Sequence, residues 1–318
     1  MTLRQLYEEG RDILSESGVP DAKLDARLLL CEAFGMTAAE YLMEGERELA
    51  ELYENTALSA MTEDYANYIA LRRRRMPLQH ILGETQFMGL PFAVNANVLI
   101  PRQDTETLVE QVLSDFPQPD VSILDMCTGS GCIAASLAVL GGYREVVGAD
   151  ISMDALYVAR ENAMRLLHDA GGRGGRQDFS GGSAFSADEE QYRQQVRFVQ
   201  TDLFSGLYDI MGELGMEQFD VIVSNPPYIR SEEIGTLLPE VRDFEPRIAL
   251  DGSEDGLHFY RRIAKEAGPY LREGGSLYLE IGADEAVAVC ELLKDAGFQD
   301  INVIRDLAGK DRVVTAKK

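Results

Sequence analysis

From about residue 105 onward, apolar segments of strand length alternate with helical patterns, and this alternation constrains the fold more than any other feature. Mainly apolar runs cover residues 121–125 and 146–150, and each ends in an aspartate. Further runs cover 196–199, 220–223 and 276–281, and shorter ones follow at 303–304 and 312–315. Continuous apolar strands that alternate with helices predict an α/β fold, in which helices cover both faces of a mostly parallel sheet.

The first 75 residues differ and predict a small all-helical domain. Apolar residues recur at helical spacing from Leu3 to Leu14, and similar stretches continue to Leu71. Thr37 and Glu40 have the spacing of a capping box at the start of a helix. Residues 72–75 are four consecutive arginines, which we interpret as the solvated end of the last helix rather than as a binding patch.

Short strand-like runs at 79–82, 85–88 and 92–94 predict a β-hairpin between the helical domain and the sheet domain. The predicted organisation is therefore a helical domain over 1–75, a hairpin linker over 76–104 and an α/β domain over 105–318. One stretch interrupts the alternation, because residues 171–182 contain six glycines and a polar segment follows. We interpret residues 171–195 as a flexible surface insertion.

The composition limits the kinds of partner and ligand that we expect the protein to bind. The net charge of −24 opposes stable binding of nucleic acid, whose affinity comes largely from Lys and Arg, and it suits a basic protein partner. No apolar run approaches the roughly 20 residues that span a bilayer, and acids occupy the N-terminus where a signal peptide is apolar. We expect a cytoplasmic protein with no membrane partner. The four cysteines form no Cys-x-x-Cys pair and there are three histidines, so no metal is expected.

A glycine turn follows the first strand of the predicted sheet. Gly129 and Gly131 stand where that strand gives way to a helix, and Asp150 ends the next strand 19 residues later. Glycines allow a ligand to approach the backbone, and a strand-end acid can bind both hydroxyls of a ribose. The pattern predicts a nucleotide-like cofactor, although a nicotinamide-dependent oxidoreductase or a non-catalytic nucleotide-binding module has the same features. Asp202, after the third strand, can accept a hydrogen bond from an adenine amino group.

The tetrapeptide Asn225–Tyr228 directly follows the buried strand that ends at Val223. Its prolines, Pro226 and Pro227, restrict the backbone and cannot donate hydrogen bonds, so a carbonyl is held facing outward. That carbonyl and the Asn225 side chain can together accept both hydrogens of a planar –NH2 group, and the Tyr228 ring can stack on its plane. Such a site activates and orients a poorly nucleophilic nitrogen for methyl transfer, without a strong general base or a metal.

Together these segments resemble the HemK/PrmC family, the N5-glutamine methyltransferases of peptide chain release factors. The resemblance extends over nearly the whole chain and includes residues 77–83, 100–106, 125–131, 225–228, 244–252 and 279–282. It implies a class I (Rossmann-like) methyltransferase sheet with a late antiparallel strand. It also implies that S-adenosyl-L-methionine is converted to S-adenosyl-L-homocysteine while the glutamine in the Gly-Gly-Gln loop of a class I release factor is methylated by a monomeric enzyme.

The resemblance also implies residue roles. Cys127, Thr128, Gly129, Ser130 and Gly131 would line the cofactor site, Asp150 would hold its ribose, and Asp202 with Leu203 would flank its adenine. Asn225, Pro226, Pro227 and Tyr228 would bind the substrate glutamine, with Asn225 also near the cofactor and with Asn225, Pro226 and Tyr228 as the catalytic residues. Residues 1–75 would dock another part of the release factor, and the helix opened by Thr105 and Glu106 would approach the methionine end of the cofactor.

Three residues depart from the family pattern. Cys127 stands where glycine is frequent, Gln103 replaces a common proline, and Leu203 replaces an aromatic residue of some members. The main alternative function is a DNA adenine-N6 methyltransferase, because such enzymes use a similar tetrapeptide on a flipped base. The acidic charge opposes this alternative.

Overall fold

The computed structural model describes residues 1–170 and 195–318, which form two compact units. The helical unit comprises Met1–Gly83 with Leu238–Phe244, and the sheet unit comprises Glu84–Leu237 with Glu245–Lys318. The predicted insertion at 171–195 lies outside the described residues, except for Gln195. Within the described ranges, no helix combines the length and the apolar composition needed to cross a bilayer.

The helical unit is built around one apolar core to which its first, second and fifth helices contribute. The Thr37 hydroxyl accepts a hydrogen bond from the Glu40 amide at 3.2 Å, and the Glu40 carboxylate accepts one from the Thr37 amide at 2.6 Å. The predicted capping box is thus confirmed. The helices are α1 (Leu3–Glu16), α2 (Ala22–Ala33), α3 (Ala38–Glu44), α4 (Leu49–Leu52), α5 (Asn55–Arg73), α6 (Leu78–Leu82) and α12 (Pro239–Phe244).

The strand expected over residues 79–82 is wrong, because these residues lie in α6. Gly83 follows α6 with φ of 75°, the left-handed conformation that commonly ends a helix. The run is too short to distinguish the two periodicities, which explains the error. The hairpin itself is confirmed: β1 (Glu84–Phe87) pairs antiparallel with β2 (Leu90–Ala93). Met88 and Gly89, with φ of 53° and 72°, supply the two positive dihedrals of a type I′ turn.

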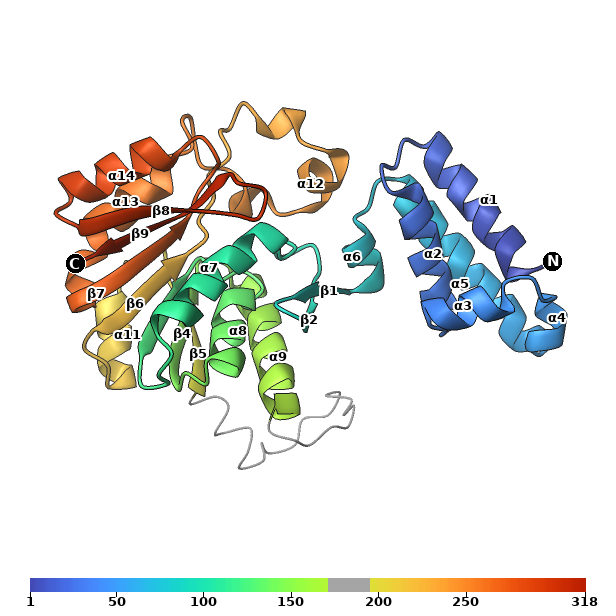
Figure 1. The fold of residues 1–318 in the computed structure, drawn as a ribbon, viewed down its shortest axis with the longest axis horizontal. Coiled ribbons are helices and arrows are strands. Elements are labelled where there is room, and N and C mark those ends of the chain that lie inside the picture. The colour runs from blue at the N-terminus through green and yellow to red at the C-terminus, as the bar shows by residue number, and fades with distance from the viewer. Residues whose placement is uncertain (171–194) are drawn as a thin grey trace. The chain divides into compact units, whose positions relative to one another are not determined.

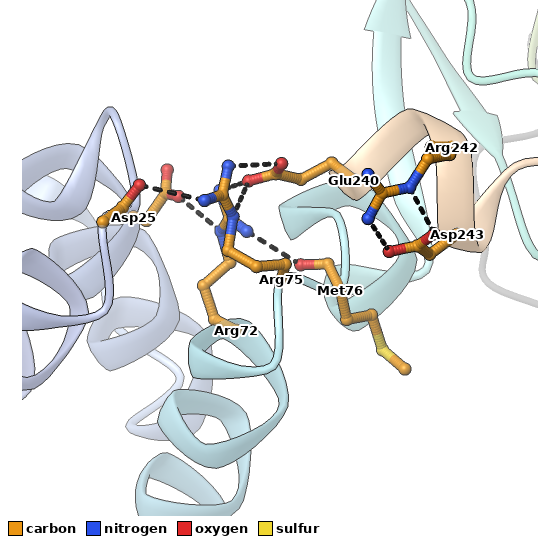
Figure 2. A network of polar contacts seen from close by, with 8 residues as sticks. Asp25, Arg72, Arg75, Met76, Glu240, Arg242 and Asp243 are labelled. Atoms are coloured by element: carbon orange, nitrogen blue, oxygen red, sulfur yellow. Dashed lines mark hydrogen bonds and ion pairs between the residues drawn. The ribbon is translucent and has the colours of Figure 1, made fainter. Parts of the chain in front are cut away.

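The interpretation of residues 72–75 as a solvated helix end is wrong for Arg72, which is buried. Its guanidinium bonds to Asp25 at 2.7 Å and to Glu240 of α12 at 2.9 Å (Figure 2). Arg75 bonds to the same Glu240 at 2.6 Å. The two arginines therefore hold α12 in the helical unit through one carboxylate, although α12 is far from them in sequence.

Glu240→Gln is expected to lower the free energy of unfolding by about 3 kcal/mol, the low end of the cost of breaking a buried ion pair. The substitution preserves size but leaves two guanidiniums facing a neutral amide. Urea unfolding followed by circular dichroism measures the change. Asp243→Asn is the matched control on the same helix, because the half-exposed Asp243 forms an ion pair with its neighbour Arg242. This substitution should shift stability by less than about 1 kcal/mol. Equal effects of the two substitutions would contradict the assignment.

The sheet unit contains a seven-stranded sheet of order β5-β4-β3-β6-β7-β9-β8. The pairs from β5 through β7 are parallel, whereas β9 pairs antiparallel with both β7 and β8. This confirms the predicted fold class. The strands are β3 (Ser122–Met126), β4 (Glu145–Asp150), β5 (Val196–Gln200), β6 (Phe219–Ser224), β7 (Leu271–Glu280), β8 (Gln299–Arg305) and β9 (Asp311–Lys317).

Both faces of the sheet are buried under helices (Figure 1). Neighbouring residues along β3 and β6 alternate between the two cores: Ile123 belongs to one and Leu124 to the other. This alternation follows from the two-residue period of a strand, and it explains why the strands are apolar throughout. One core contains α7 (Gln103–Asp115), α8 (Cys132–Leu140) and α9 (Met153–Ala170), and the other contains α11 (Leu207–Leu214), α13 (His258–Glu266) and α14 (Ala286–Asp295).

Candidate active site

The carboxyl ends of neighbouring strands bring the predicted motifs together. Met126 at the end of β3 lies opposite Ser224 of β6 and Ala149 of β4. The glycine turn, Asp150 and Asn225 therefore leave the sheet at one edge. The chain runs from β3 to β4 on one side, whereas β6 lies on the other, which is the kind of position where open α/β sheets bind ligands.

A cavity at this edge is lined by most of the predicted site residues. Gly131, Pro226 and Tyr228 are not among its lining residues. Thr105, at the start of α7, also lines it, whereas Glu106 accepts a hydrogen bond from the Met88 amide at 2.6 Å in the hairpin. The predicted residues that line the cavity are Cys127, Thr128, Gly129, Ser130, Asp150, Asp202, Leu203, Asn225 and Pro227.

The glycine turn combines an open backbone with close helix packing. Gly129 has φ of 55°, and a Cβ added to it would meet nothing within 4 Å. A Cβ on Gly131, with φ of 76°, would lie 2.9 Å from the Ala159 Cβ of α9. Gly129 thus leaves space in the turn, and Gly131 permits α8 to pack on α9. Cys127 also has a positive φ of 63°, a conformation that suits the glycine frequent in the family and costs another residue roughly 1 kcal/mol or more.

Two aspartates hold this turn. Asp150 accepts hydrogen bonds from the amides of Gly129 and Ser152, each at 2.9 Å, and burial raises the pKa of its carboxyl. Asp125, fully buried, accepts from the Thr128 hydroxyl at 2.5 Å and from the Ala134 amide at 3.1 Å. Burial outweighs these bonds and raises the pKa of Asp125 to about 7. The sequence interpretation gave Asp125 no role, although an acidic residue within a buried strand indicates a specific polar contact.

Asp202 and Leu203 follow β5. Asp202 is half exposed and accepts a hydrogen bond at 2.6 Å from Arg262 of α13. Leu203 is buried with φ of 51°. The sequence interpretation did not find Arg262, because it lies 60 residues further along the chain.

Two side chains of the tetrapeptide after β6 form hydrogen bonds with polar groups of other segments. Asn225 donates from Nδ2 to the Thr105 hydroxyl at 3.2 Å, so its Oδ1 stays available on the cavity side. The Tyr228 hydroxyl donates to Oε1 of Glu280 at 3.4 Å. Burial raises the pKa of Tyr228, so the phenol stays neutral. The stacking role of its ring stays a prediction.

Residues that follow the tetrapeptide pack directly against it. A Cβ on Gly252 would lie 2.7 Å from the Tyr228 Cα, so glycine is needed for this approach. The buried Glu245 accepts hydrogen bonds from Arg102 at 2.5 Å and from the Ile100 amide at 3.3 Å. Burial raises the pKa of Glu245, against the effect of Arg102. These contacts join residues 100–106 and 244–252, which are two separate segments of the family resemblance.

Glu280, at the end of β7, is a further residue that sequence reasoning missed. It is 1% exposed, and burial raises its pKa to about 7. The hydroxyls of Thr105 and Tyr228 and the charge of Arg312 oppose this shift. A charged residue that ends an apolar strand was the signal, but its partners lie far away in sequence.

Comparisons with known proteins agree with these features. A family model described as the PrmC N-terminal domain matches residues 5–83. Along its length the chain is similar to the release factor glutamine methyltransferase of Geobacter sulfurreducens, with 37% identity over 316 residues, which cover 98% of this chain and 95% of the relative. The protein of the same name from Clostridium botulinum is 34% identical over 325 residues, which cover 100% of both chains.

A solved structure, the hMettl16 catalytic domain in complex with MAT2A 3′UTR hairpin 6, has a TM-score of 0.51 and 15% identity, over 78% of this chain and 81% of that chain. This likeness concerns the fold alone. The two full-length relatives decide the family, because both exceed 30% identity over almost all of the chain. The protein belongs to the release factor glutamine methyltransferase family.

Proposed function

We propose that the protein transfers the methyl group of S-adenosyl-L-methionine to the side-chain amide nitrogen of the glutamine in the Gly-Gly-Gln loop of class I release factors. One observation carries the site assignment: the Asn225 amide lines the cavity with its Nδ2 already bonded to Thr105. A bonded Nδ2 leaves an acceptor for a substrate N–H. Membership of the family supports the substrate class.

The cavity residues fit the cofactor. Open space at Gly129 allows the adenosyl chain to approach the backbone, and the Asp150 carboxyl lines the cavity where a ribose would need acceptors. Asp202, held by Arg262, offers an acceptor for the adenine amino group. When bound, the cofactor supplies an electrophilic methyl group. No metal is part of this proposal.

The chain's own residues orient the nitrogen. Asn225 Oδ1 and the Pro226 carbonyl accept the two amide hydrogens of the substrate glutamine, which increases electron density on the nitrogen. Because the acceptors are held before the substrate arrives, little reorganisation is needed at the moment of transfer. Pro227 keeps the backbone of the tetrapeptide restricted, and the Tyr228 ring stacks on the plane of the bound amide.

The domain roles are also part of the proposal. Residues 1–75 dock the release factor, and residues 76–104 link the helical domain to the catalytic domain. Residues 105–318 bind the cofactor and catalyse methyl transfer. The protein acts as a monomer in the cytoplasm. The net charge of −24 favours a basic partner surface. Hydrogen exchange of the whole chain with and without release factor tests the docking role. Protection of amides within 1–75 is expected, and protection confined to 105–318 would contradict it.

The activity is tested with purified protein and methyl-labelled cofactor. Label is expected on a release factor with an intact Gly-Gly-Gln loop and absent from its Gln→Ala variant. Duplex DNA serves as the second substrate. Label on DNA without label on release factor would overturn the assignment in favour of an adenine-N6 methyltransferase.

A further inference from the structure

One arginine supplies the positive charge of the cavity. Among the lining residues that the structure describes, Asp150 and Asp202 are acidic and Arg102 is the single Lys or Arg. The proposed cofactor has a complementary set of groups. The hydroxyls and the amino group of its adenosine part donate hydrogen bonds, and the α-carboxylate of its methionine part is its only anionic group. The two acids suit those donors, and the arginine suits the carboxylate.

Arg102 lies at the end of the cavity where the methionine part is expected. The strands beneath the cavity run in the order β5-β4-β3-β6. Asp202 follows β5, Asp150 ends β4 and Asn225 follows β6, so adenine, ribose and methyl group are expected in that direction. The Thr105 hydroxyl accepts from Asn225 at 3.2 Å, and the Thr105 amide donates to the Arg102 carbonyl at 3.1 Å. Arg102 is therefore joined to the Asn225 end of the cavity, away from Asp202.

The guanidinium of Arg102 is held in place and still has donors to offer. Its Nη2 donates to Oε1 of Glu245 at 2.5 Å, and Oε2 of Glu245 accepts from the Ile100 amide at 3.3 Å. The Glu245 side chain is 1% exposed, whereas that of Arg102 is 38% exposed. Within the described ranges the bond to Glu245 is the one side-chain hydrogen bond of Arg102, although a guanidinium has five N–H donors. The remaining donors can bind an anion in the cavity.

We propose that Arg102 is a cofactor-binding residue whose guanidinium donates charge-assisted hydrogen bonds to the α-carboxylate of S-adenosyl-L-methionine. This inference rests on the cofactor part of the proposed function and is independent of the release factor. Binding of the carboxylate fixes the methionine part of the cofactor, so that the methyl group is presented to the nitrogen that Asn225 orients. Arg102 itself takes no part in the transfer of the methyl group.

A purely structural role for Arg102 would have a different consequence. In that case its charge would serve only to neutralise the buried Glu245, and its loss would disturb the cavity as a whole. The affinity for every cofactor analogue would then fall by the same factor. A carboxylate-binding role acts instead on one functional group of the ligand. Two ligands that differ only in this group therefore distinguish the two roles.

Calorimetry on the whole chain compares S-adenosyl-L-homocysteine with its decarboxylated analogue, which lacks only the α-carboxylate. The wild type should bind S-adenosyl-L-homocysteine about 30-fold more tightly than the analogue, the factor expected for charge-assisted hydrogen bonds. Arg102→Met should weaken binding of S-adenosyl-L-homocysteine about 30-fold and leave binding of the analogue within about twofold of wild type. Arg102→Lys keeps the charge but not the planar fork, and it should weaken binding of S-adenosyl-L-homocysteine alone, by about fivefold.

Arg262→Met is the matched control at the other end of the cavity. Arg262 donates to Asp202 at 2.6 Å, and the adenine that Asp202 is proposed to meet is common to both ligands. Any loss of affinity in this variant should therefore be the same for the two ligands. If Arg102→Met does not fold because Glu245 is left buried without its cation, the double variant Arg102→Met/Glu245→Gln removes both charges and decides.

The outcomes separate this inference from the proposed substrate. Equal losses for the two ligands in Arg102→Met would overturn the inference. Unchanged affinity for S-adenosyl-L-homocysteine together with a raised KM for release factor would also overturn it, because Arg102 would then bind the substrate. A wild type that binds neither ligand would overturn the cofactor proposal as well. A selective loss in Arg102→Met, with no methylation of release factor by wild type, would support the inference and count against the proposed substrate alone.

Discussion

Asn225→Ala is expected to lower the single-turnover rate of methyl transfer by about 1,000-fold, the upper range for removing one preorganised hydrogen-bonding group. The reason is local. Asn225 is the tetrapeptide side chain whose Nδ2 is occupied by Thr105 and whose Oδ1 is left for the cavity. Removing that oxygen leaves the substrate nitrogen with one acceptor and free to rotate. Rapid-quench measurement at saturating release factor and cofactor isolates this step from product release.

The same variant should bind S-adenosyl-L-homocysteine within about threefold of wild type, because the turn that Asp125 and Asp150 hold stays intact. Asn302→Ala is the matched control, since Asn302 lies in β8 and its amide bonds to the Asp300 carbonyl at 2.8 Å. It should leave both quantities unchanged. An Asn225→Ala enzyme that turns over at the wild-type rate would refute its role as the acceptor.

Sequence patterns predicted the parts of the fold that depend on local periodicity. The apolar strands, the capping box at Thr37 and the hairpin around Gly89 each follow from the properties of a few adjacent residues. The failures occurred where that information was too short or not local. Residues 79–82 fit either period, and they became α6 because Gly83 could end a helix.

Sequence patterns could not predict the long-range contacts, for a physical reason. Arg72 is buried because Asp25 and Glu240 neutralise it, and these partners lie 47 and 168 residues away. The sequence showed only a basic run at the end of a helix, which more often faces solvent. In the same way α12 belongs to the helical unit, although it lies in the loop that follows the tetrapeptide.

The same distinction between local patterns and long-range contacts applies to the site. The sequence placed Gly129, Asp150 and Asn225 at strand ends, and parallel strands must bring such ends to one edge. It could not identify Thr105 and Glu280 as partners of the tetrapeptide, because 120 residues separate Thr105 from Asn225 and 52 separate Glu280 from Tyr228. Motifs revealed the groups proposed to touch ligands, and only the fold revealed the side chains that hydrogen bond to them.

Asp150→Asn is expected to weaken binding of S-adenosyl-L-homocysteine by about 100-fold, which corresponds to about 2.7 kcal/mol. Charged hydrogen bonds contribute about 1.5–3 kcal/mol each, and the substitution removes the charge that would accept from the ribose. It also weakens the bonds from the Gly129 and Ser152 amides that shape the turn. Burial raises the pKa of Asp150, so wild-type affinity should fall as the pH falls and the carboxyl takes up a proton.

Calorimetry measures this affinity, and the kinetics separate Asp150 from Asn225. At saturating cofactor the Asp150→Asn enzyme should recover most of its turnover, because the tetrapeptide is untouched, whereas Asn225→Ala should not. Asp154→Asn, exposed in the first turn of α9, is the control that removes a nearby charge without touching the turn. NAD should bind to none of these proteins. Unchanged affinity in Asp150→Asn, or equal losses in Asp154→Asn, would mean that the strand-end carboxylate does not hold the ribose and that the cofactor assignment rests on the glycine turn alone.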